Sequence, residues 1–458
     1  MSLEVIILAA GQGTRMKSKL PKVLHPIAGK PMVGHVIDTA ARLDATVTHV
    51  VVGHGSEQLR AYLDSGMGQH RLNVVEQTEQ LGTGHAVDQA IPDVADDAVA
   101  LILYGDVPLT QYDTLKDLVD RAQQQTLALL TVDLANPTGY GRIVRDHDHQ
   151  VVAIVEHKDA SEAELAIREI NTGILALPAA WLKQWLPQLS SDNAQGEYYL
   201  TDIIAMAAEA GKPIEAVQPS CEQEVQGVNN RLQLAELERW HQLQQADHWM
   251  TQGVTLADPA RVDFRGDIEI GNDSSLDVNV ILEGKIRIGS NVSIGANCVI
   301  KDSTVADGTQ IKPNSMLDES EVGENCDIGP FARLRPGTKL AAKAKIGNFV
   351  ETKKTLVGEG SKINHLSYVG DAILGSGVNV GAGTITCNYD GVNKFQTEIG
   401  DNAFIGSNSS LVAPVRVGAG ATTGAGSTIT KSIDDGALGV ARGRQANLSG
   451  WKRPEKKA

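Results

Sequence analysis

The hydrophobic pattern changes about halfway along the chain. Residues 1–228 alternate short apolar runs with amphipathic stretches of helical spacing, such as 32–43 and 83–94. Near-continuous runs of Val, Ile and Leu that are separated by helices predict a mostly parallel sheet with helices on both faces. Such sheets bind ligands beyond the carboxyl ends of their strands. The predicted buried strands are residues 5–11, 48–55, 72–77, 98–106, 127–134, 151–158 and 173–178.

Residues 229–250 predict one long connecting helix. No Gly or Pro interrupts this segment, and its large apolar residues recur at broadly helical spacing. We interpret it as a domain linker rather than as a catalytic element. The apolar residues are Leu232, Leu234, Leu237, Trp240 and Leu243. We therefore expect one domain over 1–228, a helical linker over 229–250, and a second domain with a C-terminal tail over 251–458.

From about residue 252 onward, aliphatic residues recur every six positions. A helical period of 3.6 residues cannot produce this pattern, whereas a hexapeptide period is typical of a parallel β-helix, in which the repeated residue points inward. The period breaks at residues 387–398, which we expect to leave the coils as an external loop. The repeated positions include Ile288, Ile294 and Ile300, then Val322, Ile328 and Leu334, and finally Ile399, Ile405, Leu411, Val417, Thr423 and Ile429.

Composition narrows the possible functions. The chain has 458 residues, of which 42% are hydrophobic and 21% charged, so it can bury a large core without disulfides. Its formal net charge of −15 disfavours general binding to nucleic acids or anionic membranes. The four cysteines lack the close spacing of a zinc or redox motif. Because no apolar run is long enough for an export signal or a membrane span, we expect a cytoplasmic protein.

A glycine-rich segment follows the first predicted strand. LAAGQGTRM (8–16) lacks the lysine of a P-loop and the third glycine of the dinucleotide fingerprint. A turn between a strand and a helix can still hold phosphate on its N–H groups, although many such turns have only a geometric role. Arg15 and Lys22 follow as candidate phosphate ligands. Asp106 ends a buried strand, where a single carboxylate suits Mg²⁺, and where a turn or helix cap is the alternative.

In the C-terminal half, polar and titratable residues cluster in segments that stacked coils bring to one face. The segments are 332–337, 347–354, 364–371, 379–391 and 406–414. His365 is the titratable group in them that is suited to accept a proton near neutral pH. A lone histidine in a surface turn is more often simply solvated, so these residues alone leave its role open.

Together these motifs closely resemble the family of bacterial bifunctional N-acetylglucosamine-1-phosphate uridyltransferases/glucosamine-1-phosphate acetyltransferases. The resemblance covers nearly the whole chain. It implies a Rossmann-like nucleotidyltransferase domain, a linker helix and a left-handed parallel β-helix of hexapeptide repeats. Besides the first motif, the matching segments are LPKVLH, QLGTGHA (80–86), LYGDVPL (103–109), PTGYGRI (137–143), VEHKDA (155–160), EINTGI (169–174), GEYYLTDI (196–203) and GVNNR (227–231).

For the N-terminal half, the resemblance implies transfer of uridylyl from UTP to N-acetylglucosamine-1-phosphate. Arg15 and Lys22 would stabilise the phosphates, and Asp106 and Asn229 would bind Mg²⁺. The residues implied for uridine are Leu8, Ala9, Ala10, Gly11, Gln77, Gly82 and Thr83. Those implied for the sugar and its pocket are Gly141, Glu156, Asn171, Tyr104, Gly105, Tyr199 and Thr201. Considered alone, Glu156 could instead be a strand-end carboxylate that the backbone satisfies.

For the C-terminal half, the resemblance implies acetyl transfer from acetyl-CoA to glucosamine-1-phosphate. His365 would be the general base and Glu351 would orient it. The residues implied for the sugar phosphate are Arg335, Lys353, Lys394, Tyr368, Asn379 and Asn388. Those implied for acetyl-CoA are Ala382, Asn388, Tyr389, Ser407, Ala425 and Arg442, with Ser407 and the Ala382 backbone at the thioester. Considered singly, each basic residue could belong to a solvated face.

The resemblance also implies a homotrimer with acetyltransferase sites between neighbouring chains, to which the loop 387–398 is suited to contribute. The product, UDP-N-acetylglucosamine, would feed peptidoglycan and lipopolysaccharide synthesis. Two alternatives remain at this point. One is a nucleotidyltransferase of single activity whose β-helix only assembles the oligomer, which would leave His365 and Asn388 without a function. The other is a sensor of sugar nucleotides that catalyses nothing.

Overall fold

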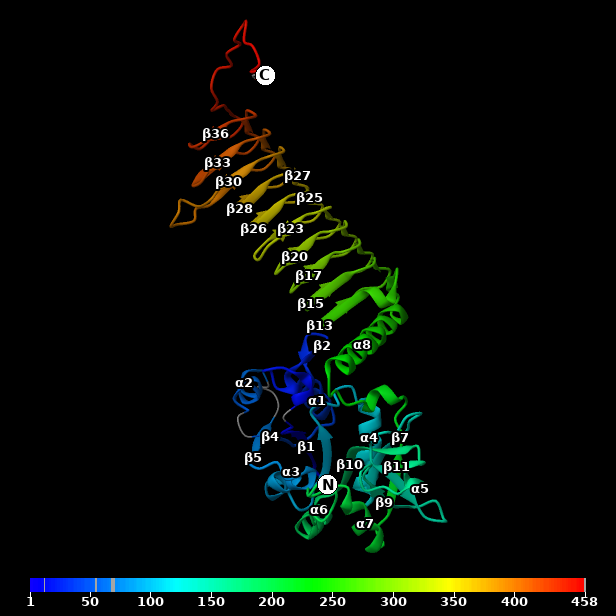
Figure 1. Ribbon diagram of the computed structural model, residues 1–458. Helices are drawn as coiled ribbons and strands as arrows, with labels where there is room; N and C mark the ends of the chain where they lie inside the picture. Colours follow the sequence, from blue (N-terminus) through cyan, green and yellow to red (C-terminus); the bar gives the residue numbers. More distant parts are fainter. Residues whose placement is uncertain (12, 54–55, 67–70, 457–458) are drawn as a thin grey trace. The chain divides into compact units, whose positions relative to one another are not determined.

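The computed structural model describes residues 1–11, 13–53, 56–66 and 71–456, and the chain divides into two compact units, residues 1–241 and 242–458 (Figure 1). Helix α8 (Arg231–Thr251) begins in the first unit and ends in the second. Within the second unit, the fully buried Gln242 side chain exchanges two hydrogen bonds with the backbone of Phe264, at 2.7 and 3.0 Å. No helix among the described residues is long and apolar enough to cross a membrane.

The first unit is built on a nine-stranded mixed sheet whose centre is parallel, as the apolar runs predict. Strand β10 runs antiparallel between β6 and β7. The main strands, in spatial order, are β11 (Ile214–Val217), β7 (Leu127–Asp133), β10 (Glu169–Pro178), β6 (Val99–Tyr104), β1 (Leu3–Ala9), β4 (Val47–Gly53) and β5 (Leu72–Gln77). Positions 54 and 55 of the strand predicted over 48–55 lie outside the described residues.

The prediction of a buried strand over 151–158 is wrong in its placement. Strand β9 (Val151–Val155) pairs with β8 (Arg142–Arg145) in an antiparallel hairpin beside the main sheet, and three of its residues are partly exposed. A Val- and Ile-rich run resembles a central strand even when only one of its faces is covered, which explains the error. Strand β8 joins the hairpin to β10 through the pair Arg142 and Ile170.

Helices cover both faces of this sheet, and each face has its own apolar core. One core contains α1 (Met32–Arg42), α2 (Glu57–Gly66) and α4 (Tyr112–Gln123). The other contains α3 (Thr83–Ala90), α6 (Ala179–Trp185) and α7 (Asp202–Glu209). The helix predicted over 83–94 is shorter than expected, because the chain changes to a 3₁₀ turn that includes Pro92, and proline cannot donate a backbone hydrogen bond.

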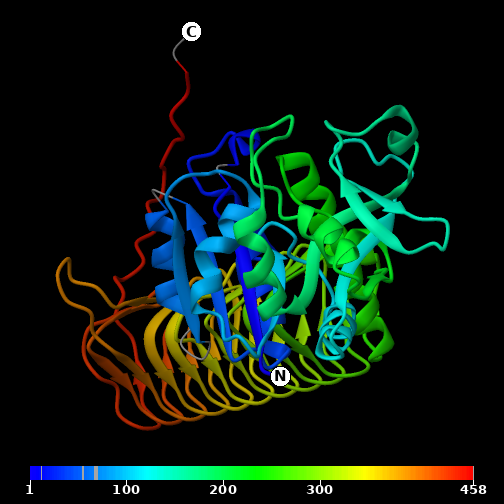
Figure 2. The same ribbon diagram turned by 90° about the horizontal axis from the view of Figure 1, so that it is seen from below.

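The second unit is a parallel β-helix whose short strands stack coil upon coil in three faces (Figures 1 and 2). The first face comprises β12 (Thr255–Leu256), β14 (Ser275–Leu276), β16 (Ser293–Ile294), β19 (Gln310–Ile311), β22 (Asp327–Ile328), β25 (Lys345–Asn348), β27 (Lys362–His365), β29 (Asn379–Val380), β32 (Phe404–Ile405), β35 (Thr422–Thr423) and β37 (Leu438–Gly439).

Long strands that turn a corner join the other two faces into one continuous sheet. These are β13 (Val262–Ile270), β15 (Val280–Ile288), β26 (Glu351–Val357) and β28 (Tyr368–Leu374). The shorter strands are β17 (Val299–Lys301), β20 (Met316–Asp318), β23 (Arg333–Leu334), β30 (Ile385–Cys387), β33 (Ser410–Val412) and β36 (Thr428–Ile429) on one face, and β18 (Thr304–Val305), β21 (Glu321–Val322), β24 (Lys339–Leu340), β31 (Thr397–Ile399) and β34 (Val415–Val417) on the other.

The residues at the predicted six-residue repeat positions lie in the core of this unit. Every repeated position named above is at most 5% exposed, and the side chains form one apolar column. Thr423 is the polar exception, and its hydroxyl is satisfied by the Gly406 N–H at 2.9 Å and by Ser409 at 3.1 Å. The insertion between β30 and β31 leaves the coils as an exposed loop, drawn in orange in Figures 1 and 2.

Candidate functional sites

A cavity of about 310 Å³ opens at the carboxyl ends of the parallel strands in the first unit. It brings together nine of the predicted nucleotide and metal residues and Tyr104, which was predicted for the sugar pocket; the nine are Leu8, Ala9, Ala10, Gly11, Lys22, Gln77, Gly82, Thr83 and Asp106. Four lining residues were not predicted: Val23, Gln80, Ala86 and Glu197. Gln80 has a visible role, because its side-chain amide donates to the Ala10 carbonyl at 2.5 Å and fastens the glycine-rich turn.

Two glycines permit the close approaches that shape this cavity. Gly82 has a φ of 116°, and a Cβ there would lie 2.6 Å from the Tyr198 carbonyl oxygen. Gly173 has a φ of 87°, and a Cβ there would lie 2.6 Å from the Tyr104 ring. A larger residue at either position would be strained and would also displace its neighbour. The loop of Gly82 and the ring of Tyr104 therefore have fixed positions in the cavity wall.

Charged groups meet where β6 ends. The Lys22 ammonium pairs with Asp106 and lies 3.4 Å from the Asn229 side-chain oxygen, to which Arg15 also donates at 2.8 Å. The Val228 N–H donates to the Asp106 carbonyl, which holds the segment around Asn229 beside the strand end. The side-chain oxygens of Asp106 and Asn229 thus both face the Lys22 ammonium. Hard oxygen ligands of this kind suit Mg²⁺, so these residues fit the metal predicted for them.

The predicted sugar residues lie together on the hairpin and on β10. The Asn171 N–H donates to the Gly141 carbonyl at 2.9 Å, and a Cβ on Gly141 would lie 3.2 Å from a Glu156 carboxylate oxygen. The Thr201 hydroxyl donates to the same carboxylate at 3.3 Å. Burial raises the pKa of Glu156 above its usual value.

Two tyrosines lie near the predicted sugar residues. Burial raises the pKa of Tyr104, and the nearby negative charges of Asp106 and Glu156 raise it further. The Tyr199 hydroxyl accepts a hydrogen bond from Gln195 at 2.9 Å. Gly105, also predicted, donates its N–H to the Leu8 carbonyl at 2.9 Å.

In the second unit, the predicted acetyltransferase residues gather at one corner of the β-helix. Backbone hydrogen bonds from Gly383 to His365, from Asn408 to Ala382 and from Gly426 to Ser407 show that these carbonyls occupy equivalent turns of successive coils. Arg442 extends the column by donating to the Ala425 carbonyl at 2.7 Å. Positions 365, 382, 407 and 425 are far apart in sequence and adjacent in space.

His365 has a partner that the sequence motifs did not single out. The exposed imidazole has its Nδ1 atom 3.0 Å from the Asn348 side-chain oxygen, one coil below. With that oxygen as acceptor, Nδ1 carries the proton and Nε2 can accept one. The carboxylate of Glu351, predicted to orient His365, accepts a hydrogen bond from Arg335 at 2.6 Å. The orienting contact that the structure records is therefore from Asn348.

Three cations cluster beside this column. The positive charges of Lys394 and Arg335 lower the pKa of Lys353, and Asp371 partly offsets them. Like charges so close repel one another unless an anion lies between them, as expected of a phosphate site. The buried Asn388 side chain donates to Asp371 at 2.5 Å, next to this cluster.

The remaining predicted residues lie nearby or on the loop. A Cβ on Gly370 would lie within 3.0 Å of both the Tyr368 hydroxyl and the Asn388 side chain, which shows how near those two are. Asn379 begins β29, the strand that follows β27 on the same face. Tyr389 lies on the insertion, and its hydroxyl donates to the Gly391 carbonyl.

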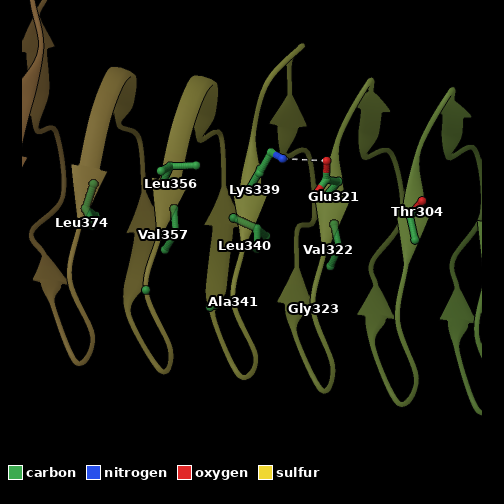
Figure 3. A pocket seen from close by; sticks show the side chains of 11 residues that line it. Thr304, Glu321, Val322, Gly323, Lys339, Leu340, Ala341, Leu356, Val357 and Leu374 are labelled. Carbon is green, nitrogen blue, oxygen red and sulfur yellow. Dashed lines mark ion pairs between the residues drawn. The ribbon is translucent and has the colours of Figure 1, made fainter.

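A larger groove, of about 610 Å³, crosses another face of the β-helix (Figure 3). Leu356 and Val357 line it, and an ion pair of 2.8 Å joins Glu321 to Lys339 across neighbouring coils. It contains none of the predicted acetyltransferase residues. The larger cavity of this unit therefore does not coincide with the predicted acetyltransferase residues, which cluster at a different corner of the β-helix.

This fold and these two clusters define a nucleotidyltransferase joined to a hexapeptide-repeat protein. Residues 5–210 match the family of MobA-like NTP transferase domains. Residues 264–344 match the GMPPB C-terminal domain, and residues 396–431 match the bacterial transferase hexapeptide family with six repeats.

Relatives named "Bifunctional protein GlmU" match the whole chain. The one from Marinobacter nauticus is 64% identical, with 99% of each chain covered. Those from Pseudomonas entomophila and Cellvibrio japonicus are 60% and 59% identical over 100% of this chain, and 99% and 100% of their own. The chain therefore belongs to the bifunctional GlmU family. Membership confirms the resemblance drawn from the sequence, with the uridyltransferase and acetyltransferase activities that it implied, over the single-activity and sensor alternatives.

Proposed function

We propose that the second unit acetylates glucosamine-1-phosphate with acetyl-CoA, and that the first unit then converts the N-acetylglucosamine-1-phosphate to UDP-N-acetylglucosamine. The observation that carries this proposal is the presence of two separate clusters in one chain. One is the cavity with Lys22, Asp106 and Asn229, and the other is the corner with His365 and three cations.

Acetyl transfer starts from the amine of glucosamine-1-phosphate. Arg335, Lys353 and Lys394 bind the phosphate, and Nε2 of His365 accepts the proton that the amine loses as it attacks the thioester carbonyl. The tetrahedral intermediate then expels CoA thiolate, which takes a proton and leaves as the thiol. Ser407 and the Ala382 backbone stabilise the oxyanion. A positioned base of this kind contributes about 10²–10⁴-fold to the rate.

Uridylyl transfer needs no nucleophile from the protein. A phosphate oxygen of N-acetylglucosamine-1-phosphate attacks the α-phosphorus of UTP in line, and pyrophosphate leaves. Arg15 and Lys22 bind the phosphates, Gln77 and the glycine-rich backbone hold the uridine, and Gly141, Glu156 and Asn171 hold the sugar. Asp106 and Asn229 would hold Mg²⁺, which offsets the repulsion between the two anions when it is bound.

We also propose a homotrimer in which the loop 387–398 completes the acetyltransferase site of a neighbour. Its support is the exposure of Tyr389 and Lys394 on a loop that leaves the coils. Sedimentation at micromolar concentration tests this, and a monomer would contradict it. The co-substrates of the two reactions, UTP and acetyl-CoA, are intracellular metabolites, which supports a cytoplasmic location. The product would then supply peptidoglycan and lipopolysaccharide synthesis.

The two half-reactions are tested separately with the purified chain. UTP, Mg²⁺ and N-acetylglucosamine-1-phosphate should give pyrophosphate, and acetyl-CoA with glucosamine-1-phosphate should give free thiol. If only pyrophosphate appears, the β-helix is a scaffold and the role of His365 is wrong. If only thiol appears, the cavity does not have the function proposed for it.

A further inference from the structure

The first unit contains a buried arginine to which no motif assigns a role. Arg142, on β8, is 1% exposed, and no carboxylate pairs with it among the described residues. Its Nε has no hydrogen-bond partner there either. The guanidinium donates to the Tyr140 carbonyl through Nη1, and Nη2 lies 3.5 Å from Nδ1 of His157. Burying a charge without a counter-ion is unfavourable, so this arrangement needs an explanation.

Arg142 lies at the centre of the proposed sugar site. Gly141 directly precedes it in the chain. Its cross-strand partners are Val155 on β9 and Ile170 on β10. Each of these strand partners is followed directly by a proposed sugar residue, Glu156 and Asn171 respectively. One strand position therefore joins all three segments that carry the site.

The contact with Tyr140 fixes one particular peptide group. The Tyr140 carbonyl and the Gly141 N–H belong to the same planar trans peptide unit, in which the C=O and N–H bonds point in opposite directions. A guanidinium that holds the carbonyl on one side therefore sets the direction of the N–H on the other. Among the described residues, no acceptor is recorded for the Gly141 N–H. The Gly141 carbonyl, in contrast, is held by Asn171.

The charge adds a second effect to this geometry. A hydrogen bond from a cation to a carbonyl polarises the peptide group, and the N–H of the same group becomes a stronger donor. The effect is large in a buried setting, where water does not screen the charge. A neutral side chain at position 142 would lose this polarisation even if it filled the same volume.

We propose that Arg142 is a positioning residue for the sugar phosphate, because it orients and polarises the Tyr140–Gly141 peptide so that the Gly141 N–H binds an oxygen of the sugar. This inference rests on the proposed uridyltransferase function and deepens it. Arg142 itself does not touch the substrate.

The kinetic test compares Arg142→Met, Arg142→Lys and a control, Arg145→Met. Arg145 lies on the same strand, is exposed, and pairs with Glu169 at 2.6 Å, so its loss disturbs the hairpin without touching the peptide in question. Arg142→Met should raise KM for N-acetylglucosamine-1-phosphate about tenfold, the size expected for one weakened hydrogen bond, and leave KM for UTP within about twofold. Arg142→Lys should recover part of the loss, because an ammonium can also donate to the carbonyl.

Two outcomes would overturn the proposal. One is an equal effect of Arg142→Met and Arg145→Met, which would show general loosening of the hairpin. The other is an equal rise in KM for both substrates. KM for UTP, measured in the same samples, shows whether the first unit of each variant is still folded. Pyrophosphate release by the wild type distinguishes failure of the proposed uridyltransferase function from failure of the inference about Arg142. Its absence refutes the proposed function. Its presence, with Arg142 variants that are unaffected, refutes only the inference.

A second readout follows the amide directly and needs binding alone. Labelling Tyr with ¹³C at the carbonyl and Gly with ¹⁵N selects the two Tyr–Gly peptides of the chain, Tyr104–Gly105 and Tyr140–Gly141. N-acetylglucosamine-1-phosphate should shift the Gly141 amide in the wild type and in Arg145→Met, and much less in Arg142→Met. The Gly105 amide, which already donates to Leu8, is the internal reference. An unmoved Gly141 resonance in the wild type would contradict the proposal.

Discussion

The two sites of this chain are built in opposite ways. The proposed nucleotide site is a cavity in one compact unit, assembled from segments between Leu8 and Asn229 that share no period. The proposed acetyltransferase site is an exposed corner, where residues such as Asn348, His365 and Ala382 meet because each coil places its turn above the one before. An aperiodic sheet isolates a few groups from water, whereas a solenoid lines up surface groups and leaves them open. The candidate acetyltransferase site is therefore the one of the two that stays open to solvent within a single chain.

The substitution expected to separate the two activities most strongly is the removal of the proposed general base, His365. His365→Asn should lower thiol release by about 10²–10⁴-fold, because it removes the proposed general base. Pyrophosphate release from added N-acetylglucosamine-1-phosphate should stay at the wild-type rate. Parallel assays of thiol and pyrophosphate measure both effects. Comparable losses in the two assays would mean that the sites do not act independently.

The converse change is Asp106→Asn. It removes a charged oxygen from the proposed metal pair with Asn229 and should lower uridylyl transfer by about 100-fold, with acetyl transfer unaffected. Chelation of divalent cations by EDTA should abolish pyrophosphate release and spare thiol release. Acetyl transfer that is equally sensitive to EDTA would contradict this division of roles.

A smaller effect is expected from the residue that holds the base. Asn348→Ala should reduce kcat for acetyl transfer about tenfold, because His365 would lose the acceptor that fixes its tautomer and ring orientation. Asn348→Asp offers an acceptor with a negative charge, which favours the protonated imidazole and should move the acidic limb of the kcat/KM profile to higher pH. An unchanged profile in both variants would show that Asn348 does not position the ring.

The smallest effect concerns pH and the three cations. Neighbouring positive charges lower the pKa of Lys353, so this lysine loses its charge at a lower pH than an ordinary lysine. Phosphate affinity from Lys353 is thus complete below that pKa and declines as the pH rises through it. KM for glucosamine-1-phosphate should rise a few-fold at alkaline pH, and Lys394→Gln should move this rise to higher pH. The same shift in KM for UTP would point to another cause.

The sequence predicted the two units unequally. In the β-helix, every coil places an aliphatic residue inward at six-residue intervals, so this period was enough to identify inward residues such as Ile405 and Leu411. In the first unit, burial depends on contacts between distant segments. The run 151–158 was therefore misplaced, since its composition is that of a central strand and its position in the hairpin depends on β8.

The candidate sites show the same contrast. The motifs identified the candidate site residues, and the structure showed which other residues they contact. Asn348 resembles an ordinary turn residue in the sequence, and only the stacking of coils places it beside His365. Arg142 lies in the motif 137–143 without a predicted role, and only the structure shows that it is buried next to Gly141 on the hairpin. Both residues lie in segments that the sequence singles out, 137–143 and 347–354, but neither segment shows what these two side chains contact.

The most direct test of two sequential activities in one chain is a time course from glucosamine-1-phosphate, acetyl-CoA, UTP and Mg²⁺, with thiol and pyrophosphate followed together. We expect thiol to appear at once and pyrophosphate after a lag, because its sugar phosphate must first be made. Added N-acetylglucosamine-1-phosphate should abolish the lag. Pyrophosphate that is released from glucosamine-1-phosphate with no release of thiol would contradict the order of reactions and the function of the β-helix.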